Sequence, residues 1–301
     1  MATHQYRDDP RNADILININ GQLFKRDEAK ISVFDSGFIL GDGVWEGLRL
    51  HAGRLVFVGE HMQRLYAGAK ALDMDIGLSK QDLVERILTT CEANNMHDDV
   101  HIRLMVTRGI KATPYQDPRV TITPATIVII PEYKSPVAPS ESGLRLFTTH
   151  VRRGYSDVQD PKLNTHSKLN CIFACIQAAK AGVDEALMLD PQGFVATCNS
   201  THFFIVRDGE VWTSSGDYCL DGITRRKVID LCKANQIPVF ERNFTLSDVY
   251  SADEAFITGT FAGLSPVGEV DGRRIGEGDF SLMKRLQTFY KQAIQAEDGQ
   301  L

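Results

Sequence analysis

One segment near the middle of the chain divides it into two parts. Between Tyr133 and Gly143 the sequence has two prolines, three serines and few apolar residues, a composition typical of a linker. The whole chain has 301 residues, enough for two domains that each bury a core of their own. We therefore predict a domain over residues 1–132, a linker over 133–143 and a second domain over 144–301.

Strand and helix patterns alternate in both parts, which predicts an α/β (α+β) fold class. The clearest strand signal is the alternation of Ile15, Ile17 and Ile19, followed by the hairpin turn Asn20-Gly21. Helices are predicted where apolar residues recur every three or four positions. The predicted strands cover residues 15–19, 22–24, 47–50, 55–58, 100–107, 126–131, 144–150, 186–189, 203–206, 211–213, 239–242 and 254–258, and the predicted helices cover about 62–72, 83–88, 169–181, 224–234 and 280–296.

Charge and composition exclude several classes of protein. The formal net charge is −6 and the pI about 5.8, so no broad basic surface is expected for nucleic acid. The longest apolar runs, such as residues 125–131, are far shorter than the roughly 20 residues of a membrane-spanning helix. The first nine residues are polar, unlike a secretory signal. These features predict a cytoplasmic protein without a membrane or nucleic-acid partner.

The six cysteines show no spacing typical of a metal site or a disulfide framework. Cys171 and Cys175 lie four residues apart on a predicted helix, where small buried residues are the ordinary interpretation. We therefore expect neither a structural metal nor disulfides.

Three short segments have the chemistry to bind an anion. Residues 220–225 run from a glycine turn into a helix, which presents the N–H groups of Ile223 and Thr224 at the positive end of the helix dipole. Thr258-Gly259-Thr260 follows a predicted strand and offers a hydroxyl, and Arg64 lies on a predicted helix. Each alone is ordinary, since helices often begin this way and arginines usually face solvent. No mononucleotide or dinucleotide fingerprint is present.

Together these segments resemble a known family. Residues 41–49 (GDGVWEGLR), 61–65 (HMQRL), 222–225 (GITR) and 258–260 (TGT) occur in the order and spacing of class IV aminotransferases. These are the fold-type IV enzymes that use pyridoxal 5'-phosphate (PLP), and they include branched-chain and D-amino-acid aminotransferases and aminodeoxychorismate lyase. The similarity runs from about Ile15 to Ile275.

The resemblance implies a smaller N-terminal α/β domain, a larger C-terminal domain with mixed sheets or a barrel and helices, and a cofactor in the cleft between them. It also implies a homodimer. By the same resemblance, the cofactor phosphate is bound by Arg64, by the backbone of Gly222, Ile223 and Thr224, and by Gly259 and Thr260.

The residues expected around the cofactor ring depart from the family pattern. Family members carry a glutamate in a segment like V-x-E-G-x-x-x-N, which pairs with the pyridine nitrogen and makes the ring an electron sink. Residues 195–202 place Thr197 at that position. A threonine can form a hydrogen bond with the nitrogen, but it has no charge to keep the nitrogen protonated.

The position of the lysine that attaches the cofactor in the family also differs from the family pattern. Family chains read D-P-x-x-K-x-x-N-x-L-N, and a gapless match to residues 160–170 places Asn164 at the lysine position. We predict that Lys168, at the start of a helix, takes the role, because a helix N-terminus lowers the pKa of an ammonium group. The alternatives are Lys162 after a two-residue shift, or no attachment at all.

The predicted substrate contacts are Arg108 and Trp45. Thr107-Arg108-Gly109 resembles a turn that holds a substrate carboxylate in D-amino-acid aminotransferases, and Trp45 offers an apolar wall. The resulting prediction is a PLP-dependent aminotransferase, similar to branched-chain aminotransferases, that moves an amino group between an amino acid or amine and a 2-oxo acid. A PLP-dependent lyase similar to aminodeoxychorismate lyase, and a PLP-binding protein that has lost transamination, are the alternatives.

Overall fold

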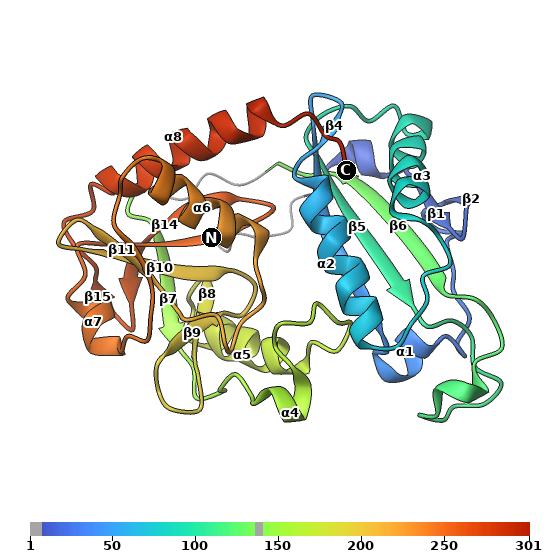
Figure 1. Cartoon of the computed structure of the whole chain (residues 1–301), viewed down its shortest axis with the longest axis horizontal. Coiled ribbons are helices and arrows are strands. Elements are labelled where there is room, and N and C mark those ends of the chain that lie inside the picture. The colour runs from blue at the N-terminus through green and yellow to red at the C-terminus, as the bar shows by residue number, and fades with distance from the viewer. Residues whose placement is uncertain (1–7, 136–140) are drawn as a thin grey trace. The chain divides into compact units, whose positions relative to one another are not determined.

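The computed structural model describes residues 8–135 and 141–301 (Figure 1). The chain forms two compact units. Residues 8–135 form the N-terminal unit together with Asn164–Ser167 and Glu297–Leu301, and residues 141–163 and 168–296 form the C-terminal unit. Residues 1–7 of the predicted first domain and 136–140 of the predicted linker lie outside the described residues. The predicted domain boundaries stay predictions.

The N-terminal unit is built on a six-stranded sheet in the order β2-β1-β6-β5-β3-β4. The predicted first hairpin is confirmed: Ile19 pairs with Gln22, and Asn20 and Gly21 both have positive φ, 53° and 91°. The strands are β1 (Leu16–Ile19), β2 (Gln22–Lys25), β3 (Gly43–His51), β4 (Arg54–Leu55), β5 (Val100–Thr107) and β6 (Thr126–Tyr133), and the helices are α1 (Ser36–Leu40), α2 (Val58–Ala71) and α3 (Lys80–Ala93), with 3₁₀ turns at Pro10–Asn12 and Pro118–Val120.

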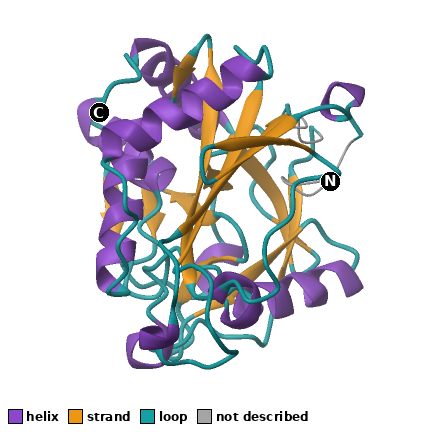
Figure 2. Ribbon diagram, turned by 90° about the vertical axis from the view of Figure 1, so that its right-hand side faces the viewer, coloured by secondary structure: helices purple, strands orange, loops and turns teal. Residues whose placement is uncertain are grey.

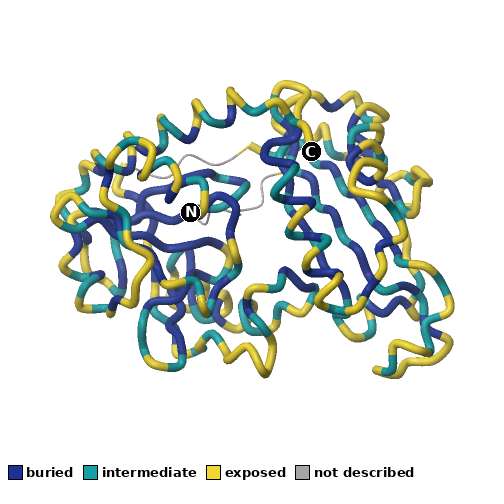
Figure 3. Tube along the Cα trace, viewed as in Figure 1, coloured by how far each residue is buried: buried dark blue, intermediate teal, exposed yellow. Residues whose placement is uncertain are grey.

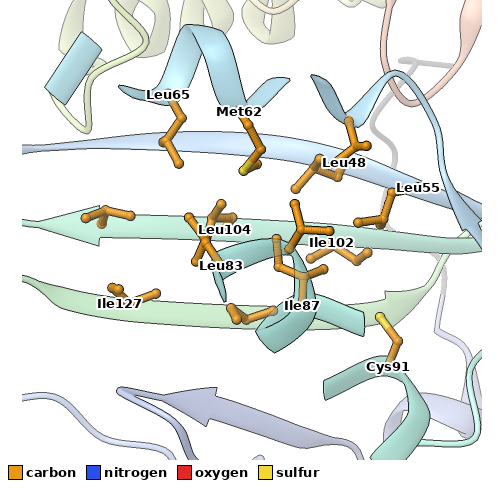
Figure 4. Packing of buried hydrophobic residues seen from close by; sticks show 14 of the residues in the cluster. Leu48, Leu55, Met62, Leu65, Leu83, Ile87, Cys91, Ile102, Leu104 and Ile127 are labelled. Atoms are coloured by element: carbon orange, nitrogen blue, oxygen red, sulfur yellow. The ribbon is translucent and has the colours of Figure 1, made fainter. Parts of the chain in front are cut away.

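Helices α2 and α3 bury one face of this sheet. Met62 and Leu65 of α2 and Leu83 and Ile87 of α3 are at most 1% exposed and point at the strands (Figure 4). The strand predicted over residues 55–58 is wrong beyond Leu55. Phe57 takes a left-handed conformation with φ 52°, which turns the chain directly into α2.

The C-terminal unit contains a nine-stranded mixed sheet. Eight strands follow the order β12-β11-β10-β13-β14-β7-β8-β9, and β15 pairs with β14. The strands are β7 (Leu144–Thr148), β8 (Glu185–Leu189), β9 (Val195–Cys198), β10 (His202–Arg207), β11 (Glu210–Thr213), β12 (Val239–Glu241), β13 (Glu254–Gly259), β14 (Gly263–Val270) and β15 (Arg273–Arg274), and the helices are α4 (Ser156–Gln159), α5 (Leu169–Lys180), α6 (Ile223–Ala234), α7 (Leu246–Tyr250) and α8 (Ser281–Ala296).

Strand β14 is the main element that the sequence patterns did not predict. It contains Pro266, and a proline inside a run argues against a central strand. The structure accommodates it because β14 pairs with β13 through Pro266 but pairs with β7 only from Val267 onward.

Helix α5 confirms the predicted helix but not the predicted burial of its cysteines. Cys175 is exposed and Cys171 only half-buried, because α5 buries its alanine face, Ala174 and Ala178. In each unit the strands are mostly buried, while the connecting turns are exposed (Figure 3).

Both units combine helices with strands (Figure 2), which confirms the predicted α/β fold class. Among the residues that the structure describes, no helix is both long and apolar enough to cross a membrane.

Candidate active site

The N-terminus of α6 has the geometry of an anion-binding site. Its N-cap residue is Gly222, which has no side chain to bond the N–H groups of the first turn. Ile223 and Thr224, the first residues of the helix, are buried. A Cβ atom at residue 222 would lie 2.1 Å from Nε2 of His202, so only glycine fits there. The site therefore offers backbone donors and the positive helix end to a closely approaching anion.

Strand β13 ends next to this helix start. His202 of β10 pairs with Thr258 of β13, and the His202 ring lies against Gly222. Gly259 closes β13 by pairing with Gly263, and Thr260 stands half-buried in the turn that follows. The structure thus brings together, within the C-terminal unit, two of the three segments that the sequence singled out.

His202 is a site residue that the sequence analysis did not single out. A signal was present, because His202 stands where the V-x-E-G-x-x-x-N pattern has its asparagine. Its importance comes from packing against Gly222, a residue 20 positions later in the chain, which no local pattern indicates.

Thr197 lies buried on β9, and its hydroxyl donates to the carbonyl oxygen of Thr201 at 2.8 Å. The same β9–β10 turn is held by the buried carboxylate of Glu185, whose Oε1 accepts from Ser200 N, Ser200 Oγ and Thr201 Oγ1 at 3.1, 2.8 and 2.8 Å. Burial, together with the charge of Glu185, raises the pKa of the Cys198 thiol well above its ordinary value. That thiol therefore stays protonated at neutral pH.

The two candidate lysines differ in their surroundings. Lys168 is the half-buried N-cap residue of α5, and its carbonyl oxygen accepts from Ile172 N at 2.9 Å. Lys162 has a 52% exposed side chain whose Nζ lies 3.9 Å from a carboxylate oxygen of Asp217, itself exposed. An exposed, loosely paired ammonium group of this kind is not held in position.

Asn164, at the position of the family lysine, is bonded to β3. Its side-chain Nδ2 donates to Trp45 O at 2.6 Å, and its carbonyl oxygen accepts from Trp45 N at 3.0 Å. His166 N donates to Gly43 O, and Trp45 Nε1 donates to Thr165 O, each at 3.0 Å. The segment Asn164–Ser167, directly before Lys168, is therefore fixed to the strand edge of the N-terminal unit.

Arg64 is the anion-binding candidate of the N-terminal unit. Its Nε donates to Oε1 of Glu46 in β3 at 2.8 Å, and its Nη2 donates to Oε2 of the same carboxylate at 2.6 Å. Nδ1 of His61 lies 2.7 Å from Glu46 Oε2. Glu46 and His61 are at most 1% exposed, while the Arg64 side chain is 15% exposed. The guanidinium group is thus held from the buried side and reaches the surface of the unit.

The pKa of Glu46 reflects opposing effects. Burial raises it, whereas the charge of Arg64 and the hydrogen bonds from His61 and Arg64 lower it. The net result is a pKa below the ordinary value, so Glu46 is ionised at neutral pH.

Arg108 and Trp45, the predicted substrate residues, also lie in the N-terminal unit. The Arg108 guanidinium bonds both carboxylate oxygens of Asp42, at 2.6 and 3.1 Å, and the carbonyl oxygens of Leu72 and Asp73, at 2.8 and 2.9 Å. These bonds fix the turn after β5. The role of Arg108 toward substrate stays a prediction.

Arg103 is a second candidate for binding a carboxylate. Its guanidinium carbon lies 3.9 Å from the centroid of the Trp45 ring. Within residues 8–135 and 141–301 its side chain forms no hydrogen bond or ion pair. Gly47, its partner across the β3–β5 pair, has no side chain to cover it. Burial lowers the pKa of Arg103, against the opposing effect of the Glu132 charge.

Comparison with known proteins gives consistent matches over most of the chain. The family model described as amino-transferase class IV matches residues 43–270. A putative branched-chain-amino-acid aminotransferase of Methanocaldococcus jannaschii is 42% identical over 278 residues, which cover 91% of this chain and 95% of the relative. Branched-chain-amino-acid aminotransferase-like protein 2 of Arabidopsis thaliana is 40% identical over 283 residues, but the matched region, 94% of this chain, spans only 51% of that relative.

A solved structure agrees with these matches. The T.th. branched-chain amino acid aminotransferase, complexed with N-(5'-phosphopyridoxyl)-L-glutamate, superposes with a TM-score of 0.86 at 32% identity, covering 94% of this chain and 95% of that one. The fold expected from the resemblance is thereby confirmed.

Proposed function

The chain belongs to the class IV aminotransferase family, and we propose that it is a PLP-dependent aminotransferase that moves an amino group between an amino acid or amine and a 2-oxo acid. The observation that carries the proposal is the start of α6, where a glycine that admits no Cβ leaves backbone donors for a dianion. The similarity to branched-chain aminotransferases suggests an apolar amino acid as one substrate.

The donor set fits the phosphate of PLP. We assign phosphate binding to the guanidinium of Arg64, to the backbone at Gly222, Ile223 and Thr224, and to Gly259 and the hydroxyl of Thr260, and contact with the ring nitrogen to Thr197. A guanidinium, a helix N-terminus and a hydroxyl are the donors that a dianion prefers. When bound, PLP supplies an electron sink that makes removal of a proton from the substrate carbon feasible.

The protein residues then have separate tasks. Lys168 would hold the cofactor through Nζ, and its amine would be the group that moves a proton to and from the substrate carbon. Thr197 would offer the ring nitrogen one hydroxyl oxygen, whose own proton is donated to Thr201 O, and would supply none of the charge of a glutamate.

We assign recognition of substrate carboxylates to Arg108 and Arg103. Arg103 is the better placed of the two, because its guanidinium stacks on Trp45 and its hydrogen-bond donors have no partner among the described residues. A partly buried guanidinium of this kind gains much from a carboxylate ligand.

We also propose that the protein is a cytoplasmic homodimer. Helix α5 exposes Leu169, Ile172, Phe173 and Ile176 by 45 to 65%, an apolar face large for a surface helix. A second copy of the chain is the partner we assign to it, since isologous pairing is the commonest way to bury such a face. Sedimentation velocity must then give twice the 33.5 kDa mass of one chain, and a monomer would refute the assignment.

The experiment that tests the function is chemical. The purified protein is incubated with PLP and reduced with borohydride, and the labelled lysine is identified by peptide mass spectrometry. Label at Lys168 that is absent from Lys168→Ala and retained in Lys162→Ala supports the proposal. Label at Lys162 moves the attachment site, and PLP binding without any labelled lysine refutes the aminotransferase mechanism.

A further inference from the structure

Two polar side chains, Glu46 and His61, are buried behind Arg64. Glu46 is wholly inaccessible and His61 is 1% exposed. Burying an arginine–glutamate pair contributes little net stability, because the cost of desolvating the charges offsets their attraction. A stability argument therefore does not account for this cluster.

Both elements that carry the cluster are rigid. Glu46 pairs with Leu104 in the middle of the β3–β5 ladder. His61 and Arg64 lie three residues apart on α2, one turn of one helix face, and Met62 and Leu65 anchor that helix in the core (Figure 4). A carboxylate on a fixed strand thus holds two side chains of a fixed helix.

The geometry determines the orientation of the guanidinium plane. Nε and Nη2 each bond a different oxygen of Glu46, which is the bidentate arrangement. His61 occupies Oε2 from a second direction and fixes the carboxylate in turn. An arginine free to rotate would lose side-chain entropy on binding a ligand, whereas one held this way has lost it on folding.

We infer that Glu46, together with His61, is a positioning residue that orients Arg64 for the phosphate group of the cofactor before the cofactor binds. The inference rests on the proposed function, since it takes the ligand of Arg64 to be a phosphate monoester. Neither Glu46 nor His61 touches the ligand. Their effect is on affinity for the phosphate alone.

The test compares two probes that differ only in the phosphate. Pyridoxamine 5'-phosphate and pyridoxamine are titrated by fluorescence against the wild-type protein, Glu46→Gln, Arg64→Ala and the double variant. Neither probe needs a lysine for binding. We expect Glu46→Gln to weaken pyridoxamine 5'-phosphate about tenfold and pyridoxamine less than about twofold. In the Arg64→Ala background, Glu46→Gln should have no further effect on either probe.

Two outcomes overturn the inference in different ways. If Arg64→Ala lowers affinity for the phosphorylated probe but Glu46→Gln does not, or if Glu46→Gln weakens both probes equally, Glu46 has no positioning role while the phosphate site stands. If Arg64→Ala leaves the preference for the phosphorylated probe unchanged, the proposed role of Arg64 itself fails.

Variants of His61 give a second test should Glu46→Gln fold poorly. Asparagine places an amide donor near the Nδ1 position, so His61→Asn should keep the preference for the phosphorylated probe, and His61→Leu should reduce it about threefold. Equal affinities of the two variants overturn the inference. Asp248→Asn, which weakens the Arg207–Asp248 pair of the C-terminal unit, is the matched control and should leave both affinities unchanged.

Discussion

Two sets of residues compare differently with the family pattern. One set is assigned to the phosphate of the cofactor and the other to its ring. The residues that we assign to the phosphate, Arg64, Gly222, Ile223, Thr224, Gly259 and Thr260, all match the pattern. The ring residues do not match: Asn164 replaces the lysine, and Thr197 replaces the glutamate. Binding a cofactor and activating it are therefore separable demands on one fold.

The physical reason lies in what each set depends on. Most of the donors that we assign to the phosphate are backbone groups at the start of α6. There His202 leaves no room for a side chain at residue 222. The ring residues act through single side chains, and changing one of them removes a single side-chain hydrogen bond, from Asn164 to Trp45 O or from Thr197 to Thr201 O. Any side chain at Gly222, by contrast, would collide with His202 and displace the helix start or the imidazole.

The strongest test of this separation is Lys168→Ala. Loss of a general base costs about 10²- to 10⁴-fold in rate, so the half-reaction with an amino donor, followed by cofactor absorbance, should slow by that factor. Affinity for pyridoxamine 5'-phosphate should change less than about threefold, because we assign Lys168 to attachment of the cofactor and not to its phosphate. Lys162→Ala is the control, and an equal loss in both variants would contradict the assignment.

Arg103→Ala tests a contact that belongs to neither set. Losing a charge-assisted hydrogen bond to a carboxylate should raise the KM for the 2-oxo acid about 10- to 100-fold, with cofactor affinity unchanged. Arg119, exposed and paired with Asp117, provides the matched control Arg119→Ala. Steady-state kinetics with varied acceptor distinguishes the two, and an unchanged KM in Arg103→Ala would remove Arg103 from the substrate site.

Gly222→Ala attacks the phosphate site through its backbone. The new Cβ would collide with His202, so the helix start or the imidazole must move. We expect pyridoxamine 5'-phosphate to bind about tenfold more weakly and the free energy of unfolding to fall by about 1 to 3 kcal/mol. Gly154, which has nothing within 4 Å of its Cβ position, gives the control Gly154→Ala. Wild-type affinity in Gly222→Ala would show that this helix start does not bind the phosphate.

Thr197→Val tests whether Thr197 stabilises the β9–β10 turn, contacts the cofactor ring, or does both. The variant loses the bond to Thr201, which should lower the free energy of unfolding by about 0.5 to 1.5 kcal/mol in urea denaturation. Thr213→Val loses an equivalent buried bond, from Thr213 Oγ1 to Phe203 O at 2.9 Å. If Thr197 contacts the ring, only its variant slows the half-reaction, by about tenfold or less. Equal rates in both variants would assign Thr197 to the turn alone.

The smallest expected effect is the pH dependence of stability from Glu46. Its pKa in the folded protein is below the ordinary 4.5, so its contribution is complete above pH 4.5 and is lost as the pH falls through the folded value. The difference in unfolding free energy between wild type and Glu46→Gln should therefore shrink in acid. A difference independent of pH between 6 and about 3 would show that folding does not lower the pKa of Glu46.

Much of the fold was predictable from local signals. The Asn20-Gly21 hairpin, α3 and the β10–β11 hairpin follow from turn residues and periodicity. Strand β14 was not, because Pro266 is tolerated only through a pairing offset between its two neighbours. The exposed apolar face of α5 was also outside the reach of periodicity, which shows that a face is apolar but not what covers it.

The site shows the same limit. The resemblance supplied the phosphate residues that we propose, because they form short continuous motifs. It did not identify Glu46 and His61 as the partners of Arg64, although all three lie in quoted motifs, because the contact between strand β3 and helix α2 is tertiary. The bonding of Asn164 to Trp45 joins residues 119 positions apart, and no pattern of spacing indicates it.

That last contact joins two segments that are synthesised far apart in time. Trp45 leaves the ribosome early, but its backbone partner Asn164 follows only after β5, β6 and β7 have been made. The N-terminal unit also receives Glu297–Leu301, the last residues of the chain, and Arg54 donates to the carbonyl oxygen of Glu297 at 2.7 Å. A fragment that stops at residue 135 therefore lacks the segment that bonds to β3, and the chain passes between the two units more than once.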